Sequence, residues 1–442
     1  MNIGSRLELF VDDYLIEKMR GVALKLQVPQ AQEVAVQFDR PWEGAYSGYP
    51  SVLKDGEGYR LYYRGWQTDG SPEVTCVAES ADGKKWVKPK LRLCEWKGSR
   101  ENNICWDGYG NHCFAPFIDL NPKAKKSERY KALAGCPPVG LVSADGLHWK
   151  QVGKPPVIRQ GAFDSLNLAF WDTVQEQYVA YVRTWDDARG KVTNDMVGYR
   201  SIGRVTSPDF RHWSDTEEID YGGSPREQLY TNAITPYFRA PHIYLGFPKR
   251  FMEARHLLTE YAEPGISETV FMTSRDGFHW DRRFMEAMIR PGRDRLNWSD
   301  RSIMTAWGVV QTGADELSIY YTENYKHKSN RLRRATLRLD GFVSVNAPFA
   351  GGTMTTKPFV FAGSELVLNY ATSAAGSVQV EMQDEAGKAV RGFALKDCPV
   401  MYGDEIEGAV QWRGGSVSGM VGKRVRLRFV MRDADLFSMR FS

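Results

Sequence analysis

Short runs of alternating apolar and polar residues recur through most of the chain, and this period-two pattern predicts β-strands. The runs come in pairs, in which an apolar run is followed by a turn and by a second, aromatic-rich run. Five pairs stand in succession: "YPSVLK" with "YRLYYRGW", "HCFAPFID" with "RYKALAG", "LNLAFWD" with "YVAYVRTW", "NAITPYFR" with "HIYLGFP", and "IMTAWGVVQT" with "ELSIYYTENY". We expect each pair to form a hairpin that is followed by a third and a fourth strand.

A turn sequence follows each pair and repeats along the chain. The strings "ESADGKKW", "VSADGLHW", "TSPDFRHW" and "TSRDGFHW" each carry an Asp four residues before a Trp, and a fainter copy, "LRLDGFVSV", lacks the Trp. Spacings of 63, 64, 67 and 64 residues separate the aspartates, which are Asp82, Asp145, Asp209, Asp276 and Asp340. An Asp side chain accepts hydrogen bonds from nearby backbone amides and Gly adopts a positive φ, so the strings predict tight turns rather than catalytic groups.

The nearly constant period predicts a repeat architecture, and four strands per repeat are typical of propeller blades. Five repeats predict an all-β fold, with a five-bladed β-propeller over residues 1–352 whose N-terminal segment, about residues 1–38, braces or closes the ring. Beyond Gly352 the alternation continues without a repeat, which predicts a C-terminal β-sandwich over residues 353–442. The turn strings resemble the Asp box of sialidase-type propellers, one residue shorter, which implies that they lie on the face away from the active site.

Composition adds little to this picture. A formal net charge of +4 on 442 residues is close to balanced, so nucleic acid and membrane partners are not expected. The chain begins without a signal-peptide pattern and has no apolar run near 18 residues, which favours a soluble, cytoplasmic protein. Six cysteines without Cys-x-x-Cys spacing favour reduced thiols, although Cys105 and Cys113 would be able to pair in an exported protein. The scattered histidines show no metal-binding spacing, so we expect neither a metal nor a cofactor, and the oligomeric state stays open.

Topology places the candidate site. The starts of all first strands, together with the loops between second and third strands, meet at one end of a propeller axis. The acidic residues there are the catalytic candidates: Asp164, Glu227 and Glu43. Substrate-binding candidates at the same end are Arg64, Trp66, His112, Arg183, Trp185, Asp187, Arg250, Trp298, Asp300 and Arg301.

Carboxylates on different blades suit glycoside hydrolysis, which needs one protonated and one ionised carboxyl group. Asp164 and Glu227 open the first strands of consecutive blades, so we expect their carboxyl groups roughly 5 to 10 Å apart. Glu227 is the expected proton donor, because Tyr230 and Trp298 would desolvate it and raise its pKa. Asp164, or Glu43 across the funnel, would stay ionised. The aromatic residues suit a sugar face, and the arginines suit an anionic sugar such as a uronate or a sulfated unit.

The openings "YPSVLKDGEGYRLYYRGW" and "FDSLNLAFWD", the Glu that opens the fourth blade and the trailing sandwich resemble the five-bladed β-propeller glycoside hydrolases, the broad invertase and arabinanase group of families 32 and 43. The resemblance spans nearly the whole chain in architecture. It implies a glycosidase with acidic residues on different blades, and Asp164 and Glu227 stand at matching places. Blade one departs from the group, because Tyr49-Pro50 stands where an Asp-Pro is expected, so that Glu43 or Asp39 would have to substitute.

Other functions remain open at this point. A noncatalytic carbohydrate-binding propeller would repeat its site in every blade, whereas here the starts of the first strands differ and only the turns repeat. A phosphorolytic relative would use Arg and Lys to hold phosphate in place of water. Sialidase-like chemistry through Arg183, Arg250 and Arg301 is a further alternative, although those enzymes usually need six blades. A glycosidase that acts on a glycan or oligosaccharide, as in polysaccharide degradation, is the function we expect.

Overall fold

The computed structural model describes residues 1–186, 192–193, 196–261 and 263–442. Within these residues the regular elements are β-strands and short 3-10 helices, and none of the helices is long and apolar enough to cross a membrane. The chain folds into two compact units. The propeller unit comprises Pro29–Thr312 and Ser318–Thr336, and the C-terminal unit comprises Met1–Val28, Gly313–Leu317 and Leu337–Ser442.

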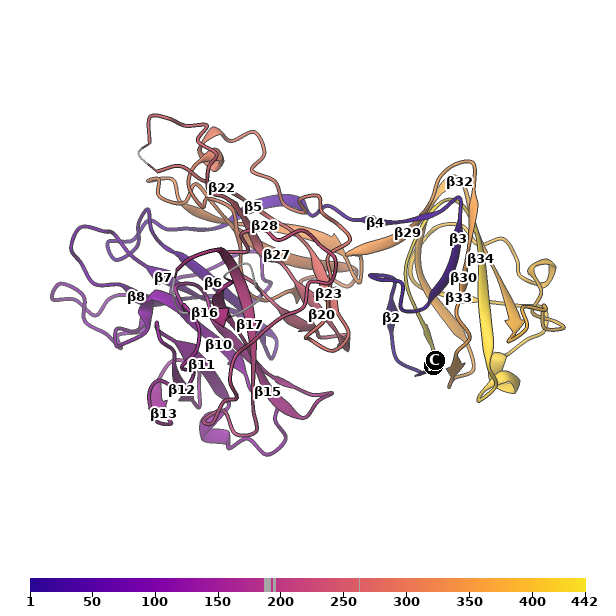
Figure 1. The fold of residues 1–442 in the computed structure, drawn as a ribbon, viewed down its shortest axis with the longest axis horizontal. Helices are drawn as coiled ribbons and strands as arrows, with labels where there is room; N and C mark the ends of the chain where they lie inside the picture. The colour runs from indigo at the N-terminus through magenta and orange to yellow at the C-terminus, as the bar shows by residue number, and fades with distance from the viewer. Residues whose placement is uncertain (187–191, 194–195, 262) are drawn as a thin grey trace. The chain divides into compact units, whose positions relative to one another are not determined.

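The propeller unit contains the five expected four-stranded sheets (Figure 1). Blade one is β6 (Gly48–Asp55), β7 (Gly58–Gly65), β8 (Val74–Ser80) and β9 (Ile104–Trp106). Blade two is β10 (Phe114–Ile118), β11 (Tyr130–Ala134), β12 (Val139–Ser143) and β13 (Lys150–Val152). Blade three is β14 (Leu168–Asp172), β15 (Gln177–Asp186), β17 (Tyr199–Ser207) and β18 (Glu217–Glu218), with β16 (Val192–Thr193) paired to β15.

Blade four is β19 (Thr235–Tyr237), β20 (Ala240–Gly246), β23 (Met272–Ser274) and β24 (Trp280–Asp281). Blade five is β25 (Met304–Thr305), β27 (Glu316–Glu323), β28 (Arg331–Arg338) and β5 (Gln30–Gln37), with β26 (Val310–Gln311) paired to β27. A separate ribbon of β21 (Lys249–Met252) and β22 (Ile266–Thr269) leaves the fourth blade after its second strand. The predicted five-bladed β-propeller is confirmed.

The ring closes through β5, which is early in the chain and pairs antiparallel with β28 as the outer strand of blade five. Closure by the N-terminal segment was expected, but the boundary of the propeller at residue 352 was wrong. The strands β2 (Glu8–Leu9), β3 (Ile16–Arg20) and β4 (Ala23–Leu26) pair instead with strands of the C-terminal unit, which also includes residues 337–352. Apolar residues of these strands lie in the core of the C-terminal unit. The boundary was misplaced because a period-two pattern predicts that a segment is a strand but does not show which strand it pairs with.

The C-terminal unit is all-β, as predicted. Its largest sheet adds β29 (Val343–Ala347), β30 (Gly352–Thr356), β32 (Leu366–Asp384), β33 (Asp404–Val410) and β34 (Val425–Phe441) to the three N-terminal strands. A parallel pair of β1 (Asn2–Gly4) and β31 (Val360–Phe361) lies outside this sheet. Register shifts interrupt the long β32–β34 pairing, as β-bulges do where a strand bends, and one core cluster includes Met354, Val380, Leu427 and Phe429.

The repeated turns have the predicted structure. Oδ1 of Asp82 accepts hydrogen bonds from the backbone N–H groups of Lys84 and Lys85 at 2.8 and 2.9 Å, and Gly83 has a φ of 71°. The copies at Asp145, Asp209 and Asp276 make the same pair of bonds. They lie at the ends of the sheets opposite to Arg64, since Ser80 pairs with Tyr59 at the far end of the β7–β8 ladder.

These turns also join neighbouring blades. Tyr62 of blade one donates to the carbonyl of Gly146 in blade two at 3.0 Å, and Tyr181 of blade three donates to the carbonyl of Gly277 in blade four at 2.6 Å. In the third copy the residue at the glycine position is Phe210, which keeps a positive φ of 65° and packs its buried ring on Phe117 of blade two. The recurrence of the string therefore reflects inter-blade packing.

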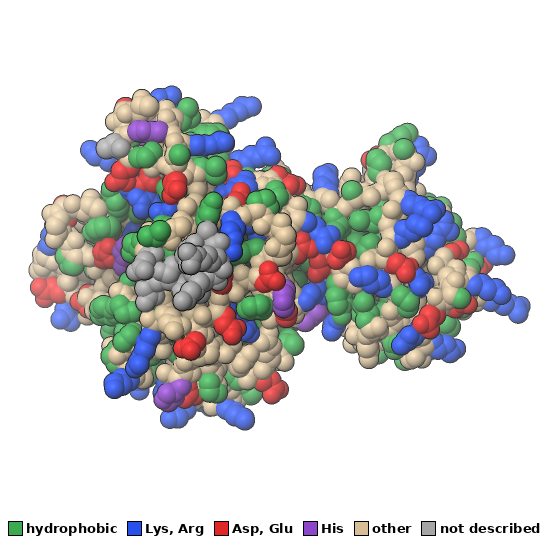
Figure 2. All heavy atoms as spheres, in the orientation of Figure 1, with side chains coloured by type: hydrophobic (Ala, Val, Ile, Leu, Met, Phe, Trp, Pro, Cys, Tyr) green, Lys and Arg blue, Asp and Glu red, His purple; other side chains and the backbone are tan. Residues whose placement is uncertain are grey.

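Cysteines and surface charge agree with the composition. The six cysteines are free, and the closest partner of Cys113 is Cys136, with the two Sγ atoms 3.0 Å apart, rather than Cys105. Figure 2 shows basic and acidic side chains interspersed over the visible face, in line with the small net charge.

Candidate active site

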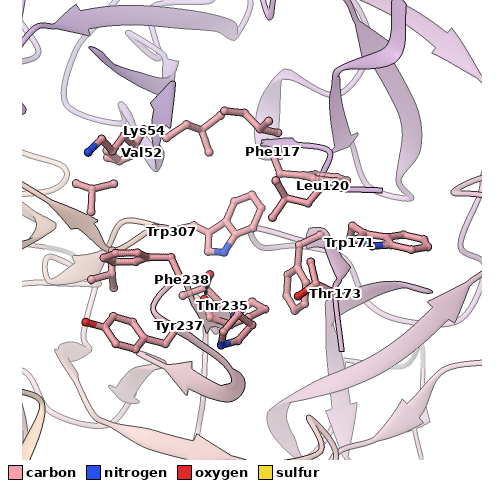
Figure 3. Close-up of a pocket in the computed structure, with 18 of the residues that line it drawn as sticks. Val52, Lys54, Phe117, Leu120, Trp171, Thr173, Thr235, Tyr237, Phe238 and Trp307 are labelled. Atoms are coloured by element: carbon pink, nitrogen blue, oxygen red, sulfur yellow. Dashed lines mark hydrogen bonds between the residues drawn. The ribbon is translucent and has the colours of Figure 1, made fainter. Parts of the chain in front are cut away.

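The first strand of every blade runs from a polar cavity to an apolar pocket. The polar cavity has a volume of about 240 Å³ and is lined by Tyr46, Tyr49, Arg64, Trp66, His112, Asp164, Tyr230, Lys249, Glu263, Arg301, Met304, Tyr325 and Lys326. The apolar pocket has about 640 Å³ and is lined by the far ends of the same strands, with rings from Phe117, Trp171, Tyr237, Phe238 and Trp307 (Figure 3). Of these two hollows, as lined by described residues, the polar cavity is the one that brings ionisable side chains from all five blades together.

Asp164 and His112 form the exposed acid–base pair of this cavity. His112 Nε2 lies 3.5 Å from Asp164 Oδ1, and the two side chains are 34% and 43% exposed. The other ring nitrogen, Nδ1, lies 2.9 Å from a carboxylate oxygen of Glu73. Burial lowers the pKa of His112, but its bonds to Asp164 and Glu73 outweigh burial and the nearby Arg64, and raise it to about 9. At neutral pH the ring is therefore an imidazolium.

The carboxylate of Asp164 is ionised for the complementary reason. Partial burial raises its pKa, but the bond to His112 and the charges of Arg183 and Arg301 hold it below its ordinary value. Arg183 lies beneath the cavity, where its guanidinium donates to the backbone carbonyl of Asp164 at 2.7 Å. A cation and an anion thus stand side by side at the cavity surface.

Arg64 organises the aromatic wall. This side chain is buried, and Nη2 donates to the Tyr46 carbonyl at 2.7 Å and to the Tyr325 hydroxyl at 2.9 Å. Its guanidinium carbon lies 4.8 Å from the ring centroid of Tyr49 and 5.2 Å from that of Trp66. The arginine's donors are thus engaged with protein groups, and its main effect is to hold the rings in place.

Arg301 and Lys326, which also line the cavity, share acidic partners. Arg301 Nη2 lies 2.6 Å from Asp300 and 3.2 Å from Glu263, and Lys326 Nζ lies 2.6 Å from Asp300. Asp300 is buried beneath both cations, whereas the side chain of Glu263 is 57% exposed at the rim. Arg301 therefore pairs with Asp300 and also lines the cavity.

Lys249 lies on the floor of the cavity. Lys249 is the first residue of β21, and its backbone forms hydrogen bonds with the backbone of Tyr230 and Thr231. Its amine lies 4.4 Å from the centroid of the Tyr230 ring. Burial, followed by the charges of Arg301, Arg183 and Arg64, holds the pKa of this amine well below its ordinary value. No hydrogen bond or ion pair joins the amine to another described residue.

The backbone is strained where it enters the cavity. Four non-glycine residues have a positive φ at or just before the start of a first strand: Tyr49 at 50°, Phe163 at 57°, Ala233 at 43° and Arg301 at 57°. Each costs roughly 1–3 kcal/mol and persists only where the surrounding structure imposes it. Among the described residues that line the apolar pocket, no non-glycine residue has a positive φ. Backbone strain of this kind clusters at functional sites, so its presence at the polar end favours the polar cavity as the candidate site.

Two of the expected catalytic acids lie elsewhere. Glu227 does not line the cavity, because its carboxylate is held between Arg250 at 3.2 Å and Arg282 at 2.5 Å. The two guanidinium groups thus hold this carboxylate outside the cavity that Asp164 lines. Glu43 is fully buried, where it accepts from the Tyr63 hydroxyl at 2.5 Å and pairs with Lys88 at 2.6 Å. It braces the start of blade one.

Of the expected binding residues, Arg64, Trp66, His112 and Arg301 line the cavity with Asp164. Arg183 and Asp300 are buried against it, and Trp185 stacks with Arg183 at 5.3 Å. Arg250 turns away to Glu268 and Glu227, and Trp298 donates to the carbonyl of Gly292, so neither lines the cavity. Asp187 lies outside the described residues.

The cavity also contains residues beyond the catalytic and substrate-binding residues named above: Tyr46, Tyr49, Tyr230, Lys249, Glu263, Met304, Tyr325 and Lys326. Lys249 and Arg250 are neighbours in β21, and successive side chains of a strand point to opposite faces, so only one of them faces the cavity. The sequence signal was "GFPKRF" directly after the second strand of blade four, but its register was not determined by the repeat. Among the described residues, no cluster of three or more His, Cys, Asp or Glu side chains could hold a metal ion.

No protein-family model matches the chain, and no curated protein matches it. Solved structures of similar fold include a glycoside hydrolase at 14% identity, covering 70% of this chain and 92% of that chain with a TM-score of 0.47. An N-acetylgalactosamine deacetylase from F. plautii, in complex with blood group B trisaccharide, is 13% identical over 72% and 96% of the two chains, with a TM-score of 0.48. The α-L-arabinanase of Penicillium chrysogenum, complexed with arabinobiose, is 9% identical over 71% and 99%, with a TM-score of 0.42.

Proposed function

We propose that the protein is a glycoside hydrolase whose reaction takes place in the polar cavity. The observation that carries this proposal is the pairing of Asp164 with His112, an ionised carboxylate beside an imidazolium, at the exposed surface of a cavity rich in aromatic rings. Hydrolysis of an O-glycosyl bond needs a group that gives a proton to the departing oxygen and a carboxylate near the positive charge that develops on the sugar.

His112 is the proposed proton donor, in place of Glu227. Its pKa of about 9 keeps the ring protonated at neutral pH, and Glu73 orients it through Nδ1 while Nε2 faces the cavity. The donated proton goes to the oxygen of the leaving group as the bond from that oxygen to the anomeric carbon breaks. His112 recovers its proton from solvent after the product leaves.

Asp164 is the proposed anion of the reaction. Its carboxylate either takes a proton from the attacking water or stabilises the positive charge at the sugar ring, and both roles require the ionised form that His112, Arg183 and Arg301 favour. The 3.5 Å gap to His112 Nε2 is wider than a good hydrogen bond and leaves the two groups separately available to a substrate.

The rings of the cavity support a sugar as the substrate. Trp66 and Tyr46 stand edge to face at 5.2 Å, and Tyr46 and Tyr325 at 5.6 Å, which forms an aromatic wall beside the acid–base pair. Sugar rings present apolar faces that stack on such walls, while their hydroxyls bond to the polar floor. We also propose an anionic sugar, a uronate or a sulfated unit, since Lys249, Arg301 and Lys326 line one side of the cavity.

The test is a panel of aryl glycosides and natural oligosaccharides, assayed with and without phosphate. Hydrolysis of at least one member, lost in Asp164→Asn, is the expected result. A variant His112→Gln should recover part of its turnover on substrates whose leaving group needs no proton, whereas Asp164→Asn should not.

The same panel separates the alternatives. Turnover that depends on phosphate and yields a sugar phosphate would identify a phosphorolytic enzyme. Binding of a sugar without turnover of any member of the panel would favour a noncatalytic carbohydrate-binding propeller.

A further inference from the structure

The amine of Lys249 differs from every other cation that lines the polar cavity. The residue is 3% exposed, it lines the cavity, and no hydrogen bond or ion pair joins its amine to another described residue. Burying an amine without a partner destabilises the folded protein, because the lost hydration is not replaced. A group of this kind at the floor of an open cavity indicates a ligand that supplies the missing partner.

The neighbouring cations already have their partners. Arg64 donates to Tyr46 and Tyr325, and Arg301 and Lys326 share Asp300 and Glu263. His112 stands between Glu73 and Asp164. The other cations that line the cavity are thus engaged with protein groups, whereas the Lys249 amine has no such partner among the described residues.

The groups around Lys249 disfavour the protonated form of its amine. The titratable and charged groups around it are Arg64, Arg183, Tyr230, Asp300 and Arg301 next to the amine, and Tyr49, His112, Asp164, Glu263, Tyr325 and Lys326 along the rest of the cavity. Burial and three guanidinium groups hold its pKa well below the ordinary value, and Asp300 opposes them only in part. An anion that enters the cavity would reverse this balance and favour the ammonium form.

We propose that Lys249 is the contact for an acid group of the substrate, a sugar carboxylate or a sulfate ester, and that the amine takes up a proton when this group binds. The proposal rests on the proposed function for the identity of the ligand as a sugar, and it names the substrate class as acidic sugars. The ammonium group carries three N–H donors that it can offer to the anion, while the Tyr230 ring stays beneath it.

The experiment measures binding to the full chain by calorimetry. The probes are the methyl glycosides of glucuronate, galacturonate and mannuronate, their neutral hexose counterparts, and inorganic sulfate. We expect at least one acidic probe to bind wild type more than 10-fold tighter than its neutral counterpart, and the preference to disappear in Lys249→Met. Over a series of pH values, heats in two buffers of different ionisation enthalpy should show a proton uptake by wild type that is absent from the variant.

Stability separates a ligand contact from a structural lysine. Methionine fills a similar volume without a charge, so Lys249→Met should melt at the same temperature as wild type or higher. Lys131 is the matched control, because it is equally buried but is paired with Asp119 at 2.7 Å, at the opposite end of its blade. Lys131→Met should melt at a lower temperature and keep the wild-type preference for the acidic probe.

Each result decides the proposal. It fails if wild type binds no acidic probe more tightly than its neutral counterpart, if Lys249→Met keeps the preference, or if this variant loses stability as Lys131→Met does. A preference for sulfate over all three uronates supports a sulfate ester as the acid group. Binding of acids without hydrolysis would overturn the proposed hydrolase and leave this inference standing. Hydrolysis of neutral glycosides without acid preference would overturn this inference together with the proposed anionic sugar, and would leave the hydrolase standing.

Discussion

The two ends of the propeller's first strands have opposite chemistry. At one end Asp164, His112, Lys249 and the tyrosines form a small cavity of about 240 Å³ that is rich in ionisable groups. At the other end an apolar pocket of about 640 Å³ is lined by Phe117, Trp307 and their neighbours. The larger volume lies at the end without the acid–base chemistry, so size alone would have pointed to the wrong end.

The two ends also differ in backbone strain and in how well their polar groups are hydrogen-bonded. The polar end holds Tyr49 and Arg301 at positive φ and a buried amine without a described partner, all of which oppose folding. At the apolar end the carboxylate of Asp172 accepts from the backbone N–H groups of Val174 and Gln175, so this polar group is satisfied within its turn. The apolar end stabilises the fold, whereas the polar end holds its ionisable groups in place at a cost in stability.

The largest effect is expected from Phe117→Ala at the apolar end. Phe117 is 3% exposed and packs on Phe210 of the next blade, so loss of the ring should lower the free energy of unfolding by about 3 kcal/mol or more. Turnover per folded molecule should stay at the wild-type level. Denaturant unfolding and an activity assay on the same preparation measure both, and a loss of activity without a loss of stability would reverse the roles of the two ends.

Asp164→Asn should have the converse effect. We expect turnover to fall about 100-fold, equivalent to about 2.7 kcal/mol in the barrier, with little change in melting temperature. The side chain is 43% exposed, so its amide replacement leaves packing intact. Wild-type turnover in this variant would remove Asp164 from the chemistry.

The pH dependence of turnover tests His112. Its pKa of about 9 in the folded protein is above the ordinary value of 6.5, so the cation is present at lower pH and is lost as pH rises through about 9. Turnover should therefore fall above pH 9 in wild type, about 10-fold for each further unit. This fall in turnover above pH 9 should be absent from the residual activity of His112→Gln. It should be unchanged in His148→Gln, because the ring of His148 is exposed on a repeated turn.

The smallest effect is expected from Asp145→Ala in a repeated turn, which should lower the free energy of unfolding by about 1 kcal/mol. Partial burial raises the pKa of Asp145, but bonds from His148 and Leu147 outweigh burial and hold it below the ordinary value. A depressed carboxyl pKa stabilises the fold above the unfolded value and loses this effect as pH falls. The difference between variant and wild type should thus shrink below about pH 4, with turnover unchanged at neutral pH.

The repeat was sufficient to predict the five blades and their turns. It worked because Asp82 and its equivalents bond to amides within a few residues, so their structure depends on local sequence. It failed for Glu43 and Glu227, whose positions in the repeat were right for a funnel but whose partners, Lys88 and Arg282, come from distant segments. Whether a carboxylate is a reactant or half of an ion pair depends on such partners.

Sequence by itself determined the all-β class, the number of blades and the separate C-terminal β-structure, because hydrophobic period, turn chemistry and repeat spacing are properties of neighbouring residues. Only the tertiary structure decided that residues 1–28 pair with C-terminal strands, that His112 stands between Glu73 and Asp164, and that Lys249 rather than Arg250 faces the cavity. Strand partners, burial and the charge around an ionisable group are set by segments far apart in the chain, and these set the chemistry of the site.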